Sequence, residues 1–350
     1  RLALDGILGS YPEFVGSRFD VDLRGPDVVE LGDFLGLNAG VTGPYRASGG
    51  LVWSGAVLEI EKLAISAGPM DVRGSGSLKN FSSFRGSSLL LNTAGPDLFA
   101  LGEWMGTDAL PHLPYSVSGR LGVGEKWLVL EEIRGGIGDI EVEASGRVGE
   151  LNRLADVQLD LKMEGPGLDG LTAEVLGFEL DDTPFELSGR VQRRETAIEV
   201  SDLRYRSTNA SVSVDGSLGT PPSLVGMKLA VVAQGPSLRE ILPDVRDYTP
   251  PDRPYRLSGN FGRPGDHGLV LDQVTVELDG VAVTASGVWD FPGEPKSASL
   301  NLHASGSDLN DLGGWEGLAL PASPFEVEAV IDGTPGSLAI HTSSASWGES

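Results

Sequence analysis

The sequence has no cysteine among its 350 residues, which excludes disulfide bonds and thiolate metal sites. It has no run of 18 apolar residues, so no segment is predicted to cross a membrane as a helix. Basic residues are scarce: 26 Lys and Arg stand against 50 Asp and Glu, and the net charge is −24. Because an acidic surface repels phosphate backbones, binding to nucleic acid is not expected.

Catalytic and metal-binding patterns are also missing. The chain has no Gly-x-Ser-x-Gly, His-Glu-x-x-His or phosphate-binding loop string. Its four histidines do not recur at a common position, and it has no Asp-x-Asp-x-Asp-Gly calcium loop. The sequence therefore predicts no enzyme: no catalytic residue, no metal site and no cofactor.

What the sequence does contain is a repeat of 70 residues. Strings such as "LPYSVSGRL" (113–121) and "RPYRLSGNF" (253–261) recur, and their prolines are Pro44, Pro114, Pro184, Pro254 and Pro324. A fixed period indicates stacked units rather than separate globular domains. We expect one continuous array over residues 1–350, with repeats at 1–43 (partial), 44–113, 114–183, 184–253, 254–323 and 324–350 (partial). Because the first repeat begins late in the period, we expect the chain to be a fragment of a longer protein.

Alternating apolar and polar residues predict about four strands in each repeat. In "IEVEASGRV" (140–148), Ile140, Val142, Ala144, Gly146 and Val148 fall on one face, and the charged residues fall on the other. Since the predicted strands are joined by brief glycine-rich turns, the sheet should be mostly antiparallel.

A helix is predicted after each Gly-Pro pair, as in "GPDLFAL" (95–101). Leu98, Leu101 and Met105 are three or four residues apart, and proline suits the first helical position. We expect one helix of about two to three turns in every repeat. The fold class is therefore all-β: an elongated, curved, mostly antiparallel sheet of tandem 70-residue repeats, each with a short helix.

The apolar face of this sheet needs a cover, because a monomer rarely leaves more than a few hundred Å² of contiguous apolar surface exposed. Two arrangements stay open: a sheet sealed against itself, or a trough that holds an apolar ligand. Glycines recur on the inward face, where they permit sharp bending, and no charge recurs regularly on it. These features favour the trough. The glycines are Gly49, Gly119, Gly189, Gly259, Gly76, Gly146, Gly216 and Gly287.

The lining of the trough would come from apolar residues at the inward positions of the strands, and it would suit acyl chains. These residues are Tyr115, Val117, Leu121, Leu128, Leu130, Ile140, Val142, Val157, Leu159, Leu161, Phe185, Leu187, Val191, Ile198, Val200, Val212, Val214, Leu229, Val231, Tyr255, Leu257, Leu271, Val281 and Val283.

The order Gly-Pro-Asp-Leu, Leu-Pro-Tyr-Ser-Val-Ser-Gly-Arg-Leu and "LVLEEIRGGIGDIEVEASGRV" (128–148) resembles the AsmA-like family of bacterial envelope proteins. The resemblance covers nearly the whole chain, and the last repeat departs from it, with Ser307 in place of Pro and Ala329 in place of Gly. It implies a repeating β-groove in the periplasmic region of an inner-membrane-anchored protein that carries phospholipid between the inner and outer membranes. Both membranes would be reached through parts outside this fragment, and no protein partner is identified. The alternative is a closed structural or adhesive β-solenoid of the cell envelope without lipid cargo.

Overall fold

The computed structural model shows an all-β protein. It describes residues 1–27, 29, 43–68, 70–105, 110–150, 155–168, 183–194, 197–219, 224–240, 248–265, 268–290, 297–315, 322–334 and 337–348. The chain divides into two compact units, Arg1–Pro184 and Phe185–Ser350. The division lies beside the start of the repeat expected at residue 184.

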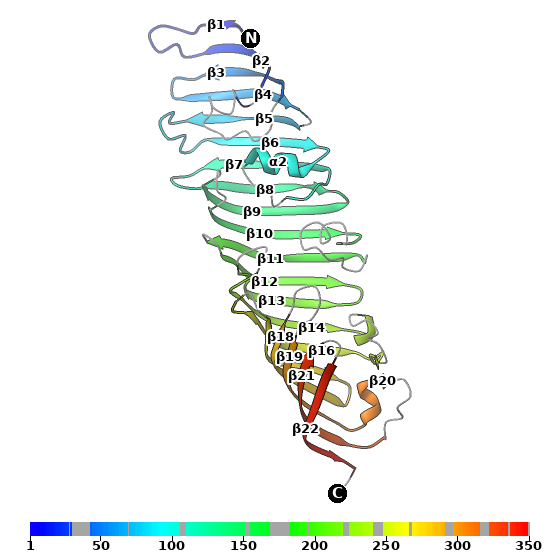
Figure 1. Cartoon of the computed structure of the whole chain (residues 1–350). Coiled ribbons are helices and arrows are strands. Elements are labelled where there is room, and N and C mark those ends of the chain that lie inside the picture. The colour runs from blue at the N-terminus through cyan, green and yellow to red at the C-terminus, as the bar shows by residue number, and fades with distance from the viewer. Residues whose placement is uncertain are drawn as a thin grey trace. The chain divides into compact units, whose positions relative to one another are not determined.

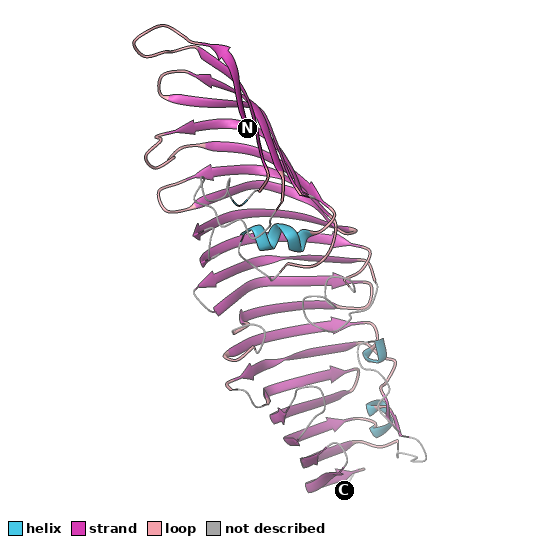
Figure 2. Cartoon of the chain, turned by 45° about the horizontal axis from the view of Figure 1, so that its top comes forward, coloured by secondary structure: helices cyan, strands magenta, loops and turns pink. Residues whose placement is uncertain are grey.

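Unit 1 is an antiparallel meander in which each strand pairs with the next one along the chain (Figure 1). Its one described α-helix, α2 (Leu98–Met105), lies in front of the sheet beside β6 and β7 (Figure 1), and Figure 2 also shows it in front of the strands. The strands are β1 (Leu2–Ile7), β2 (Ser17–Gly25), β3 (Tyr45–Trp53), β4 (Val57–Ala67), β5 (Met70–Lys79), β6 (Ser88–Gly95), β7 (Tyr115–Val123), β8 (Leu128–Ile137), β9 (Ile140–Glu150) and β10 (Ala155–Gly165).

Unit 2 repeats the same plan, again with neighbours in sequence as neighbours in the sheet. Its main strands are β11 (Phe185–Arg194), β12 (Ala197–Ser207), β13 (Ser211–Ser217), β14 (Met227–Gly235), β16 (Tyr255–Arg263), β17 (Leu269–Leu278), β18 (Val281–Asp290), β19 (Ser297–Gly306), β21 (Phe325–Thr334) and β22 (Ser337–Trp347). Two short strands, β15 (Tyr248–Thr249) and β20 (Gly314–Trp315), pair with each other outside this sheet.

The predicted fold class is confirmed. The main sheet holds twenty strands, ten in each unit, and every described pairing within a unit is antiparallel. Among the described residues neither unit closes on itself: the end strands β1, β10, β11 and β22 pair with β2, β9, β12 and β21, and no pairing joins the first strand of a unit to its last.

A β-bulge recurs in the second strand of each repeat, and the sequence analysis does not anticipate it. The register shifts at Lys62, Glu132, Asp202 and Gln273, each of which has a positive φ between 50° and 55°. Each bulge places two consecutive polar residues, such as Glu131 and Glu132, between apolar residues that both stay on the apolar face. The extra residue therefore changes the register without turning the strand over.

The predicted helices can be compared with the structure only in part. In unit 1, α2 has eight residues, about two turns, as predicted. In unit 2 the described helical residues form 3₁₀ segments of three and four residues, η1 (Leu238–Glu240) and η2 (Leu309–Leu312). The segment η2 is shorter than predicted and is followed by Gly313, a residue type that stops helices because glycine loses the most backbone entropy. The residues that follow η1, and most of the helices predicted after Gly25-Pro26 and Gly165-Pro166, lie outside the described residues.

Long connectors leave the sheet at one edge. In unit 1 this is the edge where β6 ends and β7 begins. In unit 2 it is the edge where β14 and β19 end and where β16 and β21 begin. We call this the connector edge, and the opposite edge, where hairpin loops such as 80–87 lie, the hairpin edge. In unit 2 the connectors are tied together by the β15–β20 pairing and by Arg253 Nη2, which lies 2.7 Å from Asp311 Oδ1.

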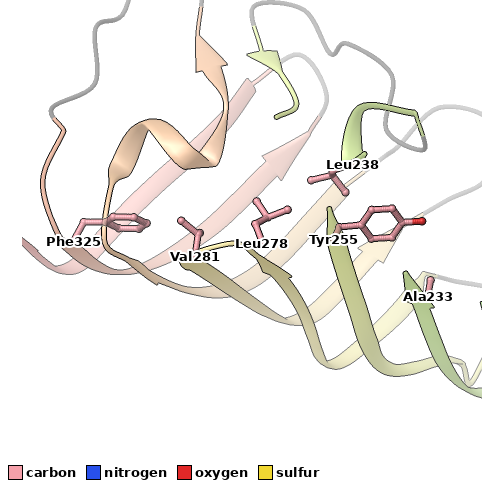
Figure 3. Close-up of a cluster of buried hydrophobic side chains, with 6 residues drawn as sticks. All are labelled: Ala233, Leu238, Tyr255, Leu278, Val281 and Phe325. Carbon is pink, nitrogen blue, oxygen red and sulfur yellow. The ribbon is translucent and has the colours of Figure 1, made fainter. Parts of the chain in front are cut away.

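A hydrophobic cluster fills the connector edge of unit 2. Figure 3 shows Tyr255, Leu278, Val281 and Phe325 rising from the curved strands while Leu238 of η1 approaches from the connector. Leu309 and Leu312 of η2 pack against the same cluster. The connectors therefore cover the apolar face at this edge.

Candidate functional site: the apolar face

Strand alternation gives unit 1 one apolar face and one charged face. In β9, Val142 lies opposite Gly135 of β8 and Met163 of β10, whereas Glu141 and Glu143 point to the other side. By the same register, all the unit 1 residues predicted to line the trough share the apolar face. They are Tyr115, Val117, Leu121, Leu128, Leu130, Ile140, Val142, Val157, Leu159 and Leu161.

The predicted lining residues of unit 2 also share one face. Leu229 of β14, for example, lies opposite Gly216 of β13 and Phe261 of β16. The full set is Phe185, Leu187, Val191, Ile198, Val200, Val212, Val214, Leu229, Val231, Tyr255, Leu257, Leu271, Val281 and Val283. Whether these surfaces hold a ligand stays a prediction.

Burial on this face is uneven. In unit 2, Val200, Val274 and Leu300 are 4–7% exposed although they lie away from the connector edge. Tyr115 and Tyr255, at the connector edge, are 5% and 4% exposed. Val117, Val142 and Leu161, further along their strands, are only half-buried. The half-buried middle is thus a feature of unit 1, where Val148 at the end of β9 is nevertheless 6% exposed.

The inward glycines are required by close approach of the neighbouring strand. A methyl group on Gly146, Gly216 or Gly287 would overlap a carbonyl oxygen of the next strand, and all three have φ between +135° and +153°. On Gly189 or Gly259 it would lie 2.7 or 2.6 Å from the Cα of Leu203 or Val274. Other side chains do not fit these positions, because the clashing atoms belong to the backbone.

The other predicted glycines form the remainder of the same two rows. A methyl group on Gly76 would overlap the carbonyl oxygen of Ser88, and one on Gly119 would lie 3.0 Å from Ile133 Cα. At Gly49 the nearest atom, Leu63 Cα, would be 3.4 Å away, which a side chain tolerates more easily. The proposed role of all eight in bending a channel stays a prediction.

Tyr255 carries a buried polar group at the connector edge that is unsatisfied within the described part of the chain, as does Ser237. Its hydroxyl is buried with no hydrogen-bond partner among the described residues. Burial, and secondarily the negative charge of Glu240, raise the pKa of Tyr255. In the matching position of unit 1, the hydroxyl of Tyr115 lies 3.4 Å from Thr93 Oγ1.

The charged face of unit 1 carries exposed ion pairs and a hollow of about 550 Å³. There Arg24 Nε and Arg46 Nη2 each lie 2.7 Å from a carboxylate oxygen of Asp22. Hydrogen bonds from Arg24 and then Arg46 hold the pKa of Asp22 well below its ordinary value. Because these side chains are solvated, the pairs add little stability. The hollow is lined by charges, so it does not suit an apolar ligand.

The hairpin edge has different chemistry in the two units. In unit 1 it carries aromatic side chains: Trp53 and Phe81 have ring centroids 5.6 Å apart, and Phe81 and Phe84 lie 6.2 Å apart. In unit 2 the last inward residues of β11 and β16 are Arg193 and Arg263, which lie opposite Ile198 and Met227. The expectation that no charge recurs on the apolar face is therefore wrong at this edge. The signal was readable, because the two arginines are 70 residues apart.

The described part of the chain has neither a membrane-spanning helix nor a metal-binding cluster of side chains. No helix in it is long and apolar enough to span a bilayer. No group of three or more His, Asp or Glu side chains in it could hold a metal ion. His112 stacks on Phe99 and lies 3.1 Å from the carboxylate of Asp97, which ties the start of α2 to the end of its connector.

Comparison with protein-family models, with curated proteins and with solved structures finds no match. The resemblance to the AsmA-like family therefore stays a prediction from the residues that carry it.

Proposed function

We propose that this chain is part of a bridge-like conduit for glycerophospholipids across the periplasm, between the inner and the outer membrane. Acyl chains would lie on the apolar face, and head groups would stay in water at the hairpin edge. The observation that carries this proposal is the half-buried middle of the apolar face in unit 1, as at Val142 and Leu161.

The chemistry of the face favours an apolar ligand. Backbone N–H and C=O groups within the sheet are used by the antiparallel ladders, so the face offers side-chain carbon and few hydrogen bonds. Burying a methylene group contributes about 0.8 kcal/mol, so a chain of methylenes gains steadily from lying on this surface. Polar ligands would lose hydration without compensation.

The size of each unit also fits acyl chains. Ten strands at about 4.8 Å per step give a face on the order of 43 Å long. One acyl chain spans about half of the ~30 Å hydrocarbon core of a bilayer. Each unit is thus long enough for lipids in succession. Because the predicted lining residues, away from the arginines of the hairpin edge, are aliphatic and aromatic, they form no single deep trap, and movement would be diffusive and non-enzymatic.

The location and the membrane partners of the conduit rest on the resemblance alone. They comprise a periplasmic position, an inner-membrane anchor and contact with both membranes through parts outside this chain. Neither nucleic acid nor a cofactor has a place in this mechanism.

Native mass spectrometry of the purified chain tests the proposal. We expect phospholipid to co-purify with the chain in stoichiometric amounts. The variant Val142→Asp should lose most of this lipid, because a charge on the apolar face repels acyl chains. It should keep its far-UV circular dichroism, because a half-buried aspartate can reach water. Ser145→Asp, on the charged face of the same strand, is the matched control and should keep the lipid.

Two results would contradict the proposal. A folded, monodisperse and lipid-free chain would favour the alternative, a structural or adhesive scaffold without cargo. Unfolding of Val142→Asp together with loss of lipid would show that the face is a sealed core.

A further inference from the structure

Two arginines interrupt the apolar face of unit 2 at equivalent places. Arg193 ends the inward row of β11 and Arg263 ends that of β16, both at the hairpin edge. The same position in the two preceding repeats is held by Trp53 and Val123. Among these four repeats, arginine therefore holds this position only in unit 2, and both arginines belong to the apolar face.

Among the residues that the structure describes, neither arginine has the acidic partner that most half-buried guanidinium groups require. Other described arginines pair with carboxylates, as in Arg120–Glu131, Arg134–Glu143 and Arg253–Asp311. Arg193 and Arg263 are half-buried, and neither forms an ion pair with a residue that the structure describes.

The environment of Arg263 resembles a site for an amphiphile. Its Nε atom is buried and has no hydrogen-bond partner in the described part of the chain. A cavity of about 140 Å³ adjoins it, and the remaining lining consists of Leu224, Met227, Gly268 and Leu269. A water molecule occupies about 30 Å³ of liquid, so there is space for a small polar group. The cavity combines one guanidinium with carbon walls.

We propose that Arg193 and Arg263 bind the phosphate of a glycerophospholipid whose acyl chains lie on the apolar face. This inference rests on the proposed function and names the chemical class of its substrate more narrowly. A guanidinium offers paired N–H donors that match phosphate oxygens. Four strand steps of about 4.8 Å separate the two residues by about 19 Å, so each arginine serves a separate lipid.

The experiment compares two lipids with identical chains. Dioleoylphosphatidylglycerol has the phosphate and dioleoylglycerol lacks it, and native mass spectrometry over a lipid concentration series measures the binding of each to the full chain. The double variant Arg193→Gln, Arg263→Gln should bind phosphatidylglycerol about tenfold more weakly, as expected for loss of a charged hydrogen bond. Its affinity for dioleoylglycerol should not change.

The matched control is the double variant Arg190→Gln, Arg256→Gln. These arginines lie on the same two strands but point to the charged face. Their loss removes the same net charge, and it should leave the binding of both lipids unchanged. A third arm adds inorganic phosphate, which should compete with phosphatidylglycerol only weakly, since it lacks acyl chains.

The outcomes separate the inference from the proposed function. If the unaltered chain binds both lipids and the Arg193, Arg263 variant retains phosphatidylglycerol, the inference is wrong and the conduit stands. Equal loss of both lipids would assign the arginines a packing role and would also overturn it. Inorganic phosphate competing as strongly as the lipid would identify free phosphate as the ligand instead. If neither lipid binds, the proposed function and the inference fail together.

Discussion

Gly146→Ala is the sharpest test of how the sheet is built. Gly146 lies in β9 with φ +153°, a conformation that side chains rarely adopt. An added methyl group would overlap the carbonyl oxygen of Gln158 and would lie 3.0 Å from Leu159 Cα. All the obstructing atoms belong to the backbone of β10, so relief requires the two strands to move apart.

The expected cost follows from these contacts. Holding alanine at this φ costs about 1–3 kcal/mol. Separating β9 from β10 weakens two or so ladder hydrogen bonds, at about 1 kcal/mol each. We therefore expect Gly146→Ala to destabilise unit 1 by about 4 kcal/mol. Gly122→Ala is the control: in β7 the nearest atom to its methyl group would be Val129 Cβ at 3.7 Å. It should be neutral, or stabilising by about 0.5 kcal/mol.

Urea unfolding followed by circular dichroism measures the loss of stability. Hydrogen exchange read by mass spectrometry over residues 140–165 locates it. We expect faster exchange in that segment for Gly146→Ala and unchanged exchange for Gly122→Ala. Equal unfolding midpoints for the two variants would refute the close-approach argument.

Tyr255→Phe should stabilise unit 2 by about 1 kcal/mol in thermal unfolding, because it removes a buried hydroxyl that has no partner in the described structure. Tyr115→Phe, which loses a contact with Thr93, should not stabilise unit 1, and a gain there would contradict the explanation. Val123→Arg places a third arginine at the 70-residue position, at the hairpin edge of unit 1. It should increase the phosphatidylglycerol bound per chain without increasing the dioleoylglycerol, whereas Val129→Arg, on the charged face, should increase neither.

The faces of the sheet could be predicted because alternation depends on neighbouring residues only. Ile140, Val142 and Val148 are an even number of residues apart, and a strand places such residues on the same face whatever surrounds it. The same reasoning missed the bulge at Glu132, although Glu131 and Glu132 are consecutive polar residues between Leu130 and Ile133. That pattern is the readable signal of an extra residue in a strand.

The difference in burial between inward residues of the same strand could not be predicted from alternation. Tyr115 and Val117 are both inward residues of β7, yet only Tyr115 is fully buried. The difference depends on where the connectors lie, which is a tertiary property. Arg263 could have been predicted from alternation, because it lies two residues after the inward Phe261, at the end of β16.

In the proposed conduit, transport and recognition make opposite demands on one surface, and the middle of the face and its hairpin edge would meet them separately. A lining that moves lipid needs shallow, similar sites, which half-buried residues such as Val142 and Leu161 supply. Such a lining cannot distinguish lipids, because an acyl chain presents only methylenes to it. Discrimination must then come from polar groups where a head group meets water. At the hairpin edge of unit 2 those groups are Arg193 and Arg263, so selectivity at that edge would slow the passage of phosphate-bearing lipids without trapping their chains.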